Sequence, residues 1–239
     1  MFTNITRTTL CITAFSIASL MAAPLNATKT ESLDWNWKFA RFGKMPDGST
    51  QPEPGKAMGF ATATSEESGN PADNAVDGDK STRWCAASGK SGEKITVDSS
   101  PSFNDKNWRS LNLPHDWGVE GPFRMEIENR TGKLPWVGIG WYRKTLEIPA
   151  DAKGNQFYLD FDGVMSRPKI YVNGHLAGEW KYGYSSFRVD ITPFLKFGQQ
   201  NTIAVRVDNP PSTSRWYPGG GIYRHVWLTE SNPVHIEHR

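Results

Sequence analysis

Apolar and polar residues alternate with a period of two along several short segments of the chain, and that period predicts half-buried β-strands. No segment carries a sustained helical period, so the pattern disfavours a Rossmann fold or an α/β barrel. The alternation is clearest over 201–208 and 222–229, is regular over 156–162, and is also present over 33–40, 141–148, 168–172 and 186–191.

Turn-forming residues separate these segments about every 8–12 residues, which is the spacing of a β-sandwich or jelly roll. The pair Asn173-Gly174 is a strong hairpin signal, because both residue types tolerate positive φ. Residues 59–98 are mostly small and polar and differ in character from the rest. The predicted fold is therefore all-β: a single jelly-roll β-sandwich with a loop-rich insertion at 59–98.

The composition agrees with a turn-rich all-β protein. The chain contains 10 Trp, 7 Tyr and 12 Phe among 239 residues, with 22 Gly and 16 Pro spread over many short segments. The formal net charge is +2. Because Lys and Arg form no basic block, we expect no nucleic-acid partner and no strong attraction to an anionic membrane.

Residues 1–23 are typical of a secretory signal peptide, with Arg7 as the only charged residue and an apolar stretch over 10–23. That stretch is too short to span a bilayer, so we expect no membrane span. We expect instead a secreted or periplasmic protein. Cys11 leaves with the signal, and Cys85 then has no partner for an intramolecular disulfide.

The most informative motif lies at 214–226, where Arg215, two aromatic rings and a run of three glycines precede a β-branched strand. Glycine admits backbone conformations closed to other residues and allows the close approach of a ligand. Arg215 offers hydrogen-bond donors and Trp216 a flat apolar face, which are groups that bind a polyhydroxylated ring. The motif indicates carbohydrate binding and does not by itself indicate catalysis.

The same motif resembles the signature that closes the N-terminal sugar-binding domain of glycoside hydrolase family 2, the β-galactosidase and β-glucuronidase family. The resemblance covers 35–39 and 103–239, and its segments occur in the family's order. They include Trp108–Trp117, Gly140–Lys144, Tyr171–Gly174 and Val205–Asn209. It implies a galactose-binding-like jelly roll, with residues 24–58 as the first strand and loop and 99–232 as the sandwich.

In family 2 β-galactosidases this domain contributes side chains to the edge of the active site. The resemblance implies that Asp116 and Asp208 are such substrate contacts, together with Arg215 and Trp216. An ionised carboxylate accepts hydrogen bonds from two adjacent sugar hydroxyls, which suits both Asp residues. A second interpretation stays open, in which Asp116 and Asp208 cap amides in turns. In that interpretation Arg215 or Arg224 pairs with Asp208 to hold the loop.

Other residues near these positions have a structural interpretation beside the functional one. Trp117 and Tyr217 are candidates for stacking on a sugar, although packing in a sandwich core is the commoner fate of an aromatic residue. His115 is not interpreted as a general base, because a His beside an Asp is common by chance. Asp160 and Asp162 share one face of a predicted strand and are interpreted as a solvated face.

The insertion at 59–98 resembles the first third of a discoidin module, over 61–67 and 74–84. In such modules the loop that matches 74–82 often holds a structural calcium ion. Oxygen donors at Asp77 and Asp79 suit that cation, whereas an Asp-Gly turn without an ion explains the same residues. No cofactor is assigned, and a structural calcium ion near Asp77 and Asp79 stays an open alternative.

A retaining glycosidase needs two carboxyl groups roughly 5–5.5 Å apart. In family 2 both are Glu residues of a downstream barrel, and residues 233–239 resemble the start of the family's next domain, so we expect no catalytic residue in this chain. The predicted function is that of the N-terminal, non-catalytic domain of a secreted β-galactosidase-like hydrolase. Its expected partners are a β-galactoside-like carbohydrate and the downstream catalytic domains. A stand-alone carbohydrate-binding module is the alternative, and a structural or adhesive jelly roll is a third interpretation.

Overall fold

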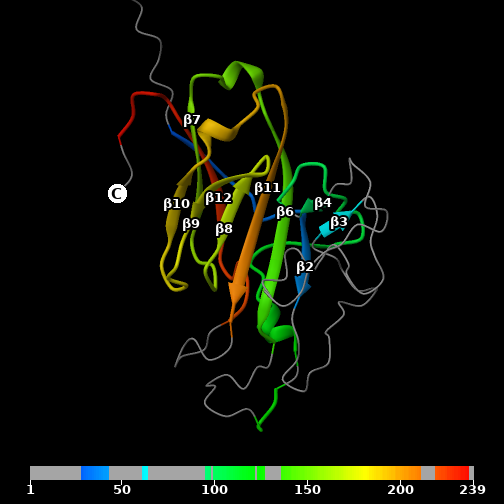
Figure 1. Cartoon of the computed structure of the whole chain (residues 1–239). Helices are drawn as coiled ribbons and strands as arrows, with labels where there is room; N and C mark the ends of the chain where they lie inside the picture. Colours follow the sequence, from blue (N-terminus) through cyan, green and yellow to red (C-terminus); the bar gives the residue numbers. More distant parts are fainter. Residues whose placement is uncertain are drawn as a thin grey trace, which may run out of the picture.

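The computed structural model describes residues 28–42, 61–63, 95–97, 99–121, 123–126, 136–210 and 219–236 of the chain. Two antiparallel sheets pack face to face in a β-sandwich (Figure 1), which confirms the predicted all-β fold. In these described residues the helical turns are short 3₁₀ segments: η2 (Trp117–Glu120), η3 (Ala150–Ala152) and η4 (Thr192–Phe194).

The first sheet has four strands in the order β1-β12-β7-β10. Their bounds are Lys29–Ser32 for β1, Val226–Ser231 for β12, Gln156–Phe161 for β7 and Phe187–Asp190 for β10. Strand β7 shows why the alternating pattern forms a strand here. Its residues Phe157, Leu159 and Phe161 are buried, while the residues between them are half-buried. One face of β7 therefore belongs to the core and the other faces outward.

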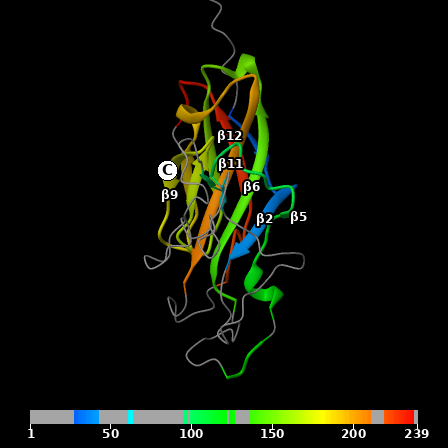
Figure 2. The ribbon, with the colours of Figure 1, turned by 45° about the vertical axis from the view of Figure 1, so that its right-hand side comes forward.

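The second sheet has six strands in the order β5-β2-β6-β11-β8-β9. Figure 2 shows β2, β6 and β11 running side by side. Strands β6 and β11 pair over their full length, from Gln199 opposite Ile148 to Asn209 opposite Gly138. The bounds are Arg109–Leu111 (β5), Trp37–Phe42 (β2), Gly138–Ile148 (β6), Gln199–Asn209 (β11), Lys169–Val172 (β8) and His175–Glu179 (β9).

Within the predicted insertion at 59–98 the structure describes a two-stranded sheet. Strand β3 (Ala61–Ala63) pairs antiparallel with β4 (Ile95–Val97). The Asn173-Gly174 hairpin between β8 and β9 is confirmed, since both residues have positive φ, 51° and 85°. Two glycine-compatible conformations in succession are what a tight hairpin turn of this kind requires.

The core lies between the two sheets and is formed by their inward-facing aliphatic and aromatic side chains. Ile203, Val205 and Val207 of β11 are fully buried there. Each such side chain contributes about 1.5–3 kcal/mol through burial. Trp117 is also fully buried and packs in the same core, which confirms the structural interpretation of that residue.

Two predicted strands have different bounds in the structure. The pattern at 33–40 does not form one strand, because the chain passes from β1 to β2 there through Asn36, whose φ is +59°. The pattern at 222–229 begins too early. Ile222 accepts a hydrogen bond from the His115 N–H, so it pairs outside the sheet, and β12 starts at Val226.

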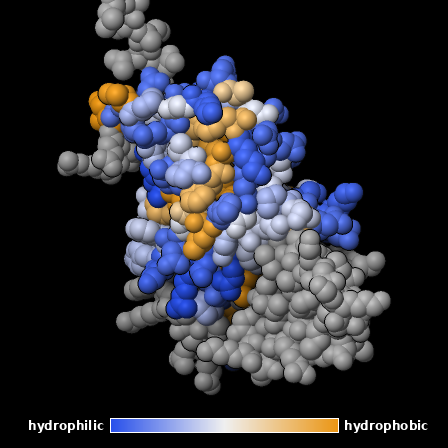
Figure 3. Space-filling model, turned by 45° about the horizontal axis from the view of Figure 1, so that its top comes forward, coloured by the Kyte–Doolittle hydropathy of each residue, from blue (hydrophilic) through white to orange (hydrophobic). Residues whose placement is uncertain are grey.

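Figure 3 shows one face of the sandwich, on which hydrophilic residues border an apolar stripe. Among the described residues no helix has the length and apolar character needed to cross a membrane.

Candidate functional site

The candidate site lies at the end of the sandwich where β11 ends, the lower end in Figure 1. Asp208 is the second-last residue of β11. Its backbone N–H donates to the Ser166 carbonyl at 2.9 Å, and the Ser166 hydroxyl donates to the Asp208 carbonyl at 2.8 Å. These two bonds fix the backbone of Asp208, so its half-buried carboxylate projects from a rigid position.

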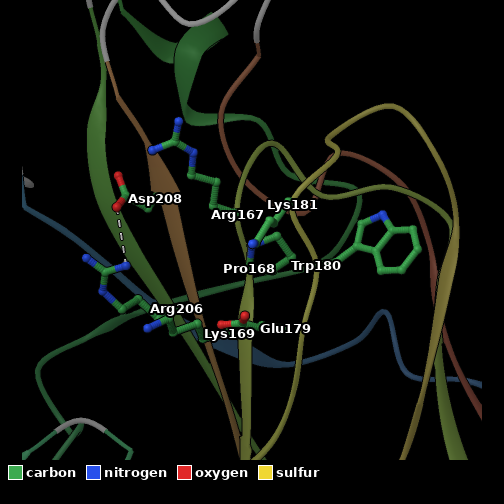
Figure 4. A pocket seen from close by; sticks show the side chains of 8 residues that line it. All are labelled: Arg167, Pro168, Lys169, Glu179, Trp180, Lys181, Arg206 and Asp208. Atoms are coloured by element: carbon green, nitrogen blue, oxygen red, sulfur yellow. Dashed lines mark hydrogen bonds and ion pairs between the residues drawn. The ribbon is translucent and has the colours of Figure 1, made fainter.

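Asp208 lines an open pocket with a volume of about 620 Å³. Figure 4 shows three segments around it: the end of β11, the chain entering β8, and the end of β9. The charged lining residues are Arg167, Lys169, Glu179, Lys181, Arg206 and Asp208. In this pocket a carboxylate that can accept from hydroxyls lies among several cationic donors.

The ion-pair partner of Asp208 is Arg206 of the same strand, with Nη1 and Oδ2 3.4 Å apart. The proposed alternative partner Arg224 makes no such pair and has an exposed side chain. Residues two apart on a strand face the same side, so Arg206 reaches the carboxylate without any contribution from the glycine motif. For Arg224 the predicted pairing is therefore wrong.

Asp116 precedes η2 and caps it. Its Oδ1 accepts a hydrogen bond of 2.8 Å from the Gly118 N–H. Asp116 is not among the described residues that line the pocket of Asp208. The turn-capping interpretation of Asp116 is confirmed for this oxygen, and a contact with sugar stays a prediction.

The glycine run connects the two Asp residues through their neighbours. The Trp117 N–H donates to the Gly220 carbonyl at 2.8 Å, and the Asn209 amide Nδ2 donates to the Gly219 carbonyl. Gly221 exchanges two backbone hydrogen bonds with Met165. The segment beginning at Gly219 therefore joins η2, the end of β11 and the loop after β7.

At Gly220 and Gly221 the protein's own core requires glycine. The glycine run was instead expected to allow the close approach of a ligand, and for these two residues that expectation is corrected. A Cβ on Gly220 would lie 2.6 Å from the Trp117 indole nitrogen. A Cβ on Gly221 would lie 2.2 Å from the Tyr142 hydroxyl, and Gly221 also has a φ of +117°. Both residues are thus fixed by packing against buried aromatic rings.

A partly buried polar network supports this end of the sandwich. His115 Nδ1 lies 2.6 Å from the Tyr142 hydroxyl, and its Nε2 lies 2.7 Å from Arg109 Nη2 and 3.1 Å from Glu120 Oε1. Arginine only donates and carboxylate only accepts, so Nε2 accepts from Arg109 or donates to Glu120 according to its protonation. The network ties η2 to β5 and β6 and accounts for His115 as a structural residue.

Two pKa values in this network are shifted. Burial raises the pKa of the Tyr142 hydroxyl well above its ordinary value, so this group stays protonated. For Glu120 burial acts upward, but hydrogen bonds and charge interactions with His115 and Arg109 outweigh it and lower the pKa from 4.5 to about 2. Glu120 is therefore ionised at neutral pH and can serve as a permanent acceptor.

A family model described as "Glycosyl hydrolases family 2, sugar binding domain" matches residues 30–231, most of the chain. The chain belongs to glycosyl hydrolase family 2. The resemblance drawn from the sequence motifs is thereby confirmed, and the sandwich is the sugar binding domain of that family.

The similarity extends to curated proteins and solved structures. The domain is 48% identical over 139 residues to the β-galactosidase BoGH2A of Bacteroides ovatus, which covers 57% of this chain and 16% of that protein. It is 43% identical over 141 residues to a putative β-glucuronidase of Formosa agariphila, covering 58% and 14%. The crystal structure of a β-glycosidase from Bacteroides vulgatus superposes with a TM-score of 0.60 at 34% identity, covering 87% of this chain and 21% of that one.

Several predicted residues of the family 2 domain lie outside the described residues. Arg215 and Trp216 of the glycine motif belong to this group, as do Asp77 and Asp79 of the possible calcium loop. Among the described residues no group of three or more His, Cys, Asp or Glu side chains is arranged to hold a metal ion. A sugar contact by Arg215 or Trp216 stays a prediction.

The cationic pocket lining of the family 2 domain was not predicted from the sequence. Lys169 and Arg206 occupy positions that alternate with buried residues of β8 and β11, so the period-two pattern places both on the outward face. The outward position of Lys169 and Arg206 could therefore have been predicted from the sequence. Arg167 carried no comparable signal, because it lies in a loop with φ +46° and reaches the pocket only through the fold.

Proposed function

We propose that this chain is the N-terminal, non-catalytic carbohydrate-binding domain of a secreted, β-galactosidase-like glycoside hydrolase. Membership of the family 2 sugar binding domain supports the proposal, as do relatives named as β-galactosidases and β-glucuronidases. The chain matches 16% and 14% of the length of the first two relatives. Hydrolysis in the whole enzyme is therefore assigned to domains beyond the matched part.

The observation that carries the proposal is the position of Asp208. Its backbone is fixed by two hydrogen bonds to Ser166, while its carboxylate borders an open pocket of about 620 Å³. A rigidly held carboxylate accepts hydrogen bonds from adjacent sugar hydroxyls with little loss of side-chain entropy. We assign Asp208 as a substrate-edge contact, with Asp116, Arg215 and Trp216 as further contacts of the same domain.

No catalytic residue is assigned in the chain. Asp160 is engaged by Arg188 through two bonds, Nε to Oδ1 at 2.6 Å and Nη2 to Oδ2 at 2.8 Å. Asp162 accepts from the Trp227 indole N–H at 3.1 Å. Carboxylates held in this way act as structural acceptors of the first sheet, and neither is poised as the acid or nucleophile of a glycosidase.

The substrate-contact role is tested with Asp208→Asn, which keeps the shape of the side chain and removes its charge. We expect galactose affinity to fall about ten-fold, as loss of charge-assisted bonds implies. The free energy of unfolding should change by less than about 0.5 kcal/mol. Asp151→Asn, at an exposed position within η3, is the matched control and should leave affinity unchanged. Unaltered galactose binding in Asp208→Asn would contradict the role.

The multidomain and secretion parts of the proposal need a separate measurement. An antibody against this domain should detect, outside the cytoplasm of the source cells, a species much heavier than 26.7 kDa. Its N-terminus should lack residues 1–23 by mass spectrometry. A native species at or just below 26.7 kDa would refute the assignment to a larger hydrolase and favour a stand-alone binding module.

A further inference from the structure

The pocket that contains Asp208 has an excess of positive charge. Among its described lining residues, Arg167, Lys169, Lys181 and Arg206 are cationic, whereas Glu179 and Asp208 are acidic. The formal charge of the whole chain is only +2. The pocket thus collects cationic side chains from three separate segments at one place on the outward face of the second sheet.

Most of this positive charge is not neutralised by the residues that the structure describes. In the part of the chain that the structure describes, the side chains of Arg167, Lys169 and Lys181 make no hydrogen bond or ion pair. Arg206 contacts Asp208 at 3.4 Å, a distance long for a strong charge-assisted bond. An anion entering the pocket therefore meets donors that are free to bind it.

The aromatic residue of the pocket does not offer its ring to a ligand there. The Trp180 ring stacks on Phe187, with centroids 5.6 Å apart and planes 12° apart, and its Nε1 donates to the Ser185 hydroxyl at 3.1 Å. Figure 4 shows the ring directed away from the charged side chains. Recognition in this pocket consequently depends on charge and hydrogen bonds, more than on stacking against a neutral sugar.

We infer that this pocket binds an acidic saccharide, one whose ring carries a carboxylate or a sulfate ester. The anionic group lies between Arg167, Lys169 and Arg206, and neighbouring hydroxyls donate to the Asp208 carboxylate. A planar guanidinium suits the two oxygens of either anion. The inference rests on the proposed carbohydrate-binding function and gives that function a ligand class.

The test compares four probes by isothermal titration and amide chemical shifts of the chain: galactose, glucuronic acid, galactose 6-sulfate and inorganic sulfate. At low ionic strength we expect at least one acidic sugar to bind about ten-fold more tightly than galactose, with shifts at Lys169 and Arg206. That preference should weaken as salt is raised to about 0.5 M. The tighter of the two acidic sugars identifies carboxylate or sulfate as the preferred group.

Variants locate the effect. Arg167→Gln and Lys169→Gln should each reduce acidic-sugar affinity about three-fold or more beyond any change in galactose affinity. Lys196→Gln, an exposed residue after η4, should leave both unchanged. Galactose binding as tightly as the acidic sugars overturns the inference and leaves the proposed function standing. Inorganic sulfate binding as tightly as galactose 6-sulfate overturns it as well, and binding of none of the sugars overturns both.

Discussion

His115 Nδ1 lies 2.6 Å from the hydroxyl of Tyr142, and the same hydroxyl accepts a hydrogen bond of 3.3 Å from the Ile222 N–H. One buried oxygen thus connects the segment before η2, the central strand β6 and the segment after the glycine run. These three segments surround the end of the sandwich where Asp208 projects. The arrangement of these three segments therefore depends on one buried hydroxyl group.

Tyr142→Phe should destabilise the domain while preserving its packing. The substitution leaves His115 Nδ1 and the Ile222 N–H without their buried partner, at a cost of about 1–3 kcal/mol. Chemical denaturation measures the loss. Tyr182→Phe is the control, because Tyr182 is exposed and its hydroxyl bonds to no described residue, so it should cost less than about 0.5 kcal/mol. Equal stability of the two variants would show that the Tyr142 hydroxyl does not hold these segments.

Gly221→Ala should be more damaging than Gly154→Ala, although both glycines have positive φ, +117° and +106°. The two substitutions share backbone strain of about 1–3 kcal/mol. A Cβ at Gly221 also meets the Tyr142 hydroxyl at 2.2 Å, whereas nothing lies within 4 Å at Gly154. We expect a difference of at least about 1–3 kcal/mol in the free energy of unfolding from this overpacking. If both variants lose the same free energy of unfolding, the positive φ alone accounts for the requirement for glycine at position 221.

Much of the sandwich could be predicted because its central strands alternate in the way a two-layer core demands. Strands β7 and β11 carry inward aliphatic and aromatic residues at every second position, so the period was visible. Strand β1 has the sequence KTES and no apolar residue, so it left no pattern and was missed. Strand β1 forms because it pairs antiparallel with the edge of β12, and that edge exists only in the assembled fold.

The candidate site was predictable only in part, for a similar reason. Asp208 was proposed as a site residue from the family resemblance, and the period-two pattern placed it at the end of a strand, which agrees with its position in β11. The pocket around it brings together 167–169, 179–181 and 206–208, and no local pattern relates these segments. The glycine run was recognised as unusual, but its cause, contact with Trp117 and Tyr142, depends on packing between distant segments.

Asp105→Asn should weaken the attachment of the segment at 99–108 to the outward face of the second sheet. Asp105 Oδ2 accepts from Arg143 Nε at 2.9 Å, and the Arg143 side chain is only 3% exposed. Removing the negative charge leaves the buried guanidinium with a weaker partner. Because a hydrogen bond to a charged group contributes about 1.5–3 kcal/mol, the free energy of unfolding should fall by up to that amount. Thermal unfolding measures the loss. Asp151→Asn, an exposed change in η3, should be neutral, and an equally neutral Asp105→Asn would mean that Arg143 is satisfied by its other contacts.

Glu120 should contribute to stability in a pH-dependent way. Although burial acts to raise its pKa, His115 and Arg109 lower it from 4.5 to about 2 in the folded chain. A group with a depressed folded pKa stabilises the fold above its unfolded pKa and loses that contribution as pH falls through the folded value. The difference in melting temperature between the natural chain and Glu120→Gln should therefore be constant above about pH 5 and shrink between about pH 4.5 and pH 2. Glu147→Gln, at an exposed position of β6, is the control and should change the melting temperature little. A Glu120→Gln difference that stays constant down to pH 2 would show that the ion pair with Arg109 does not stabilise the fold.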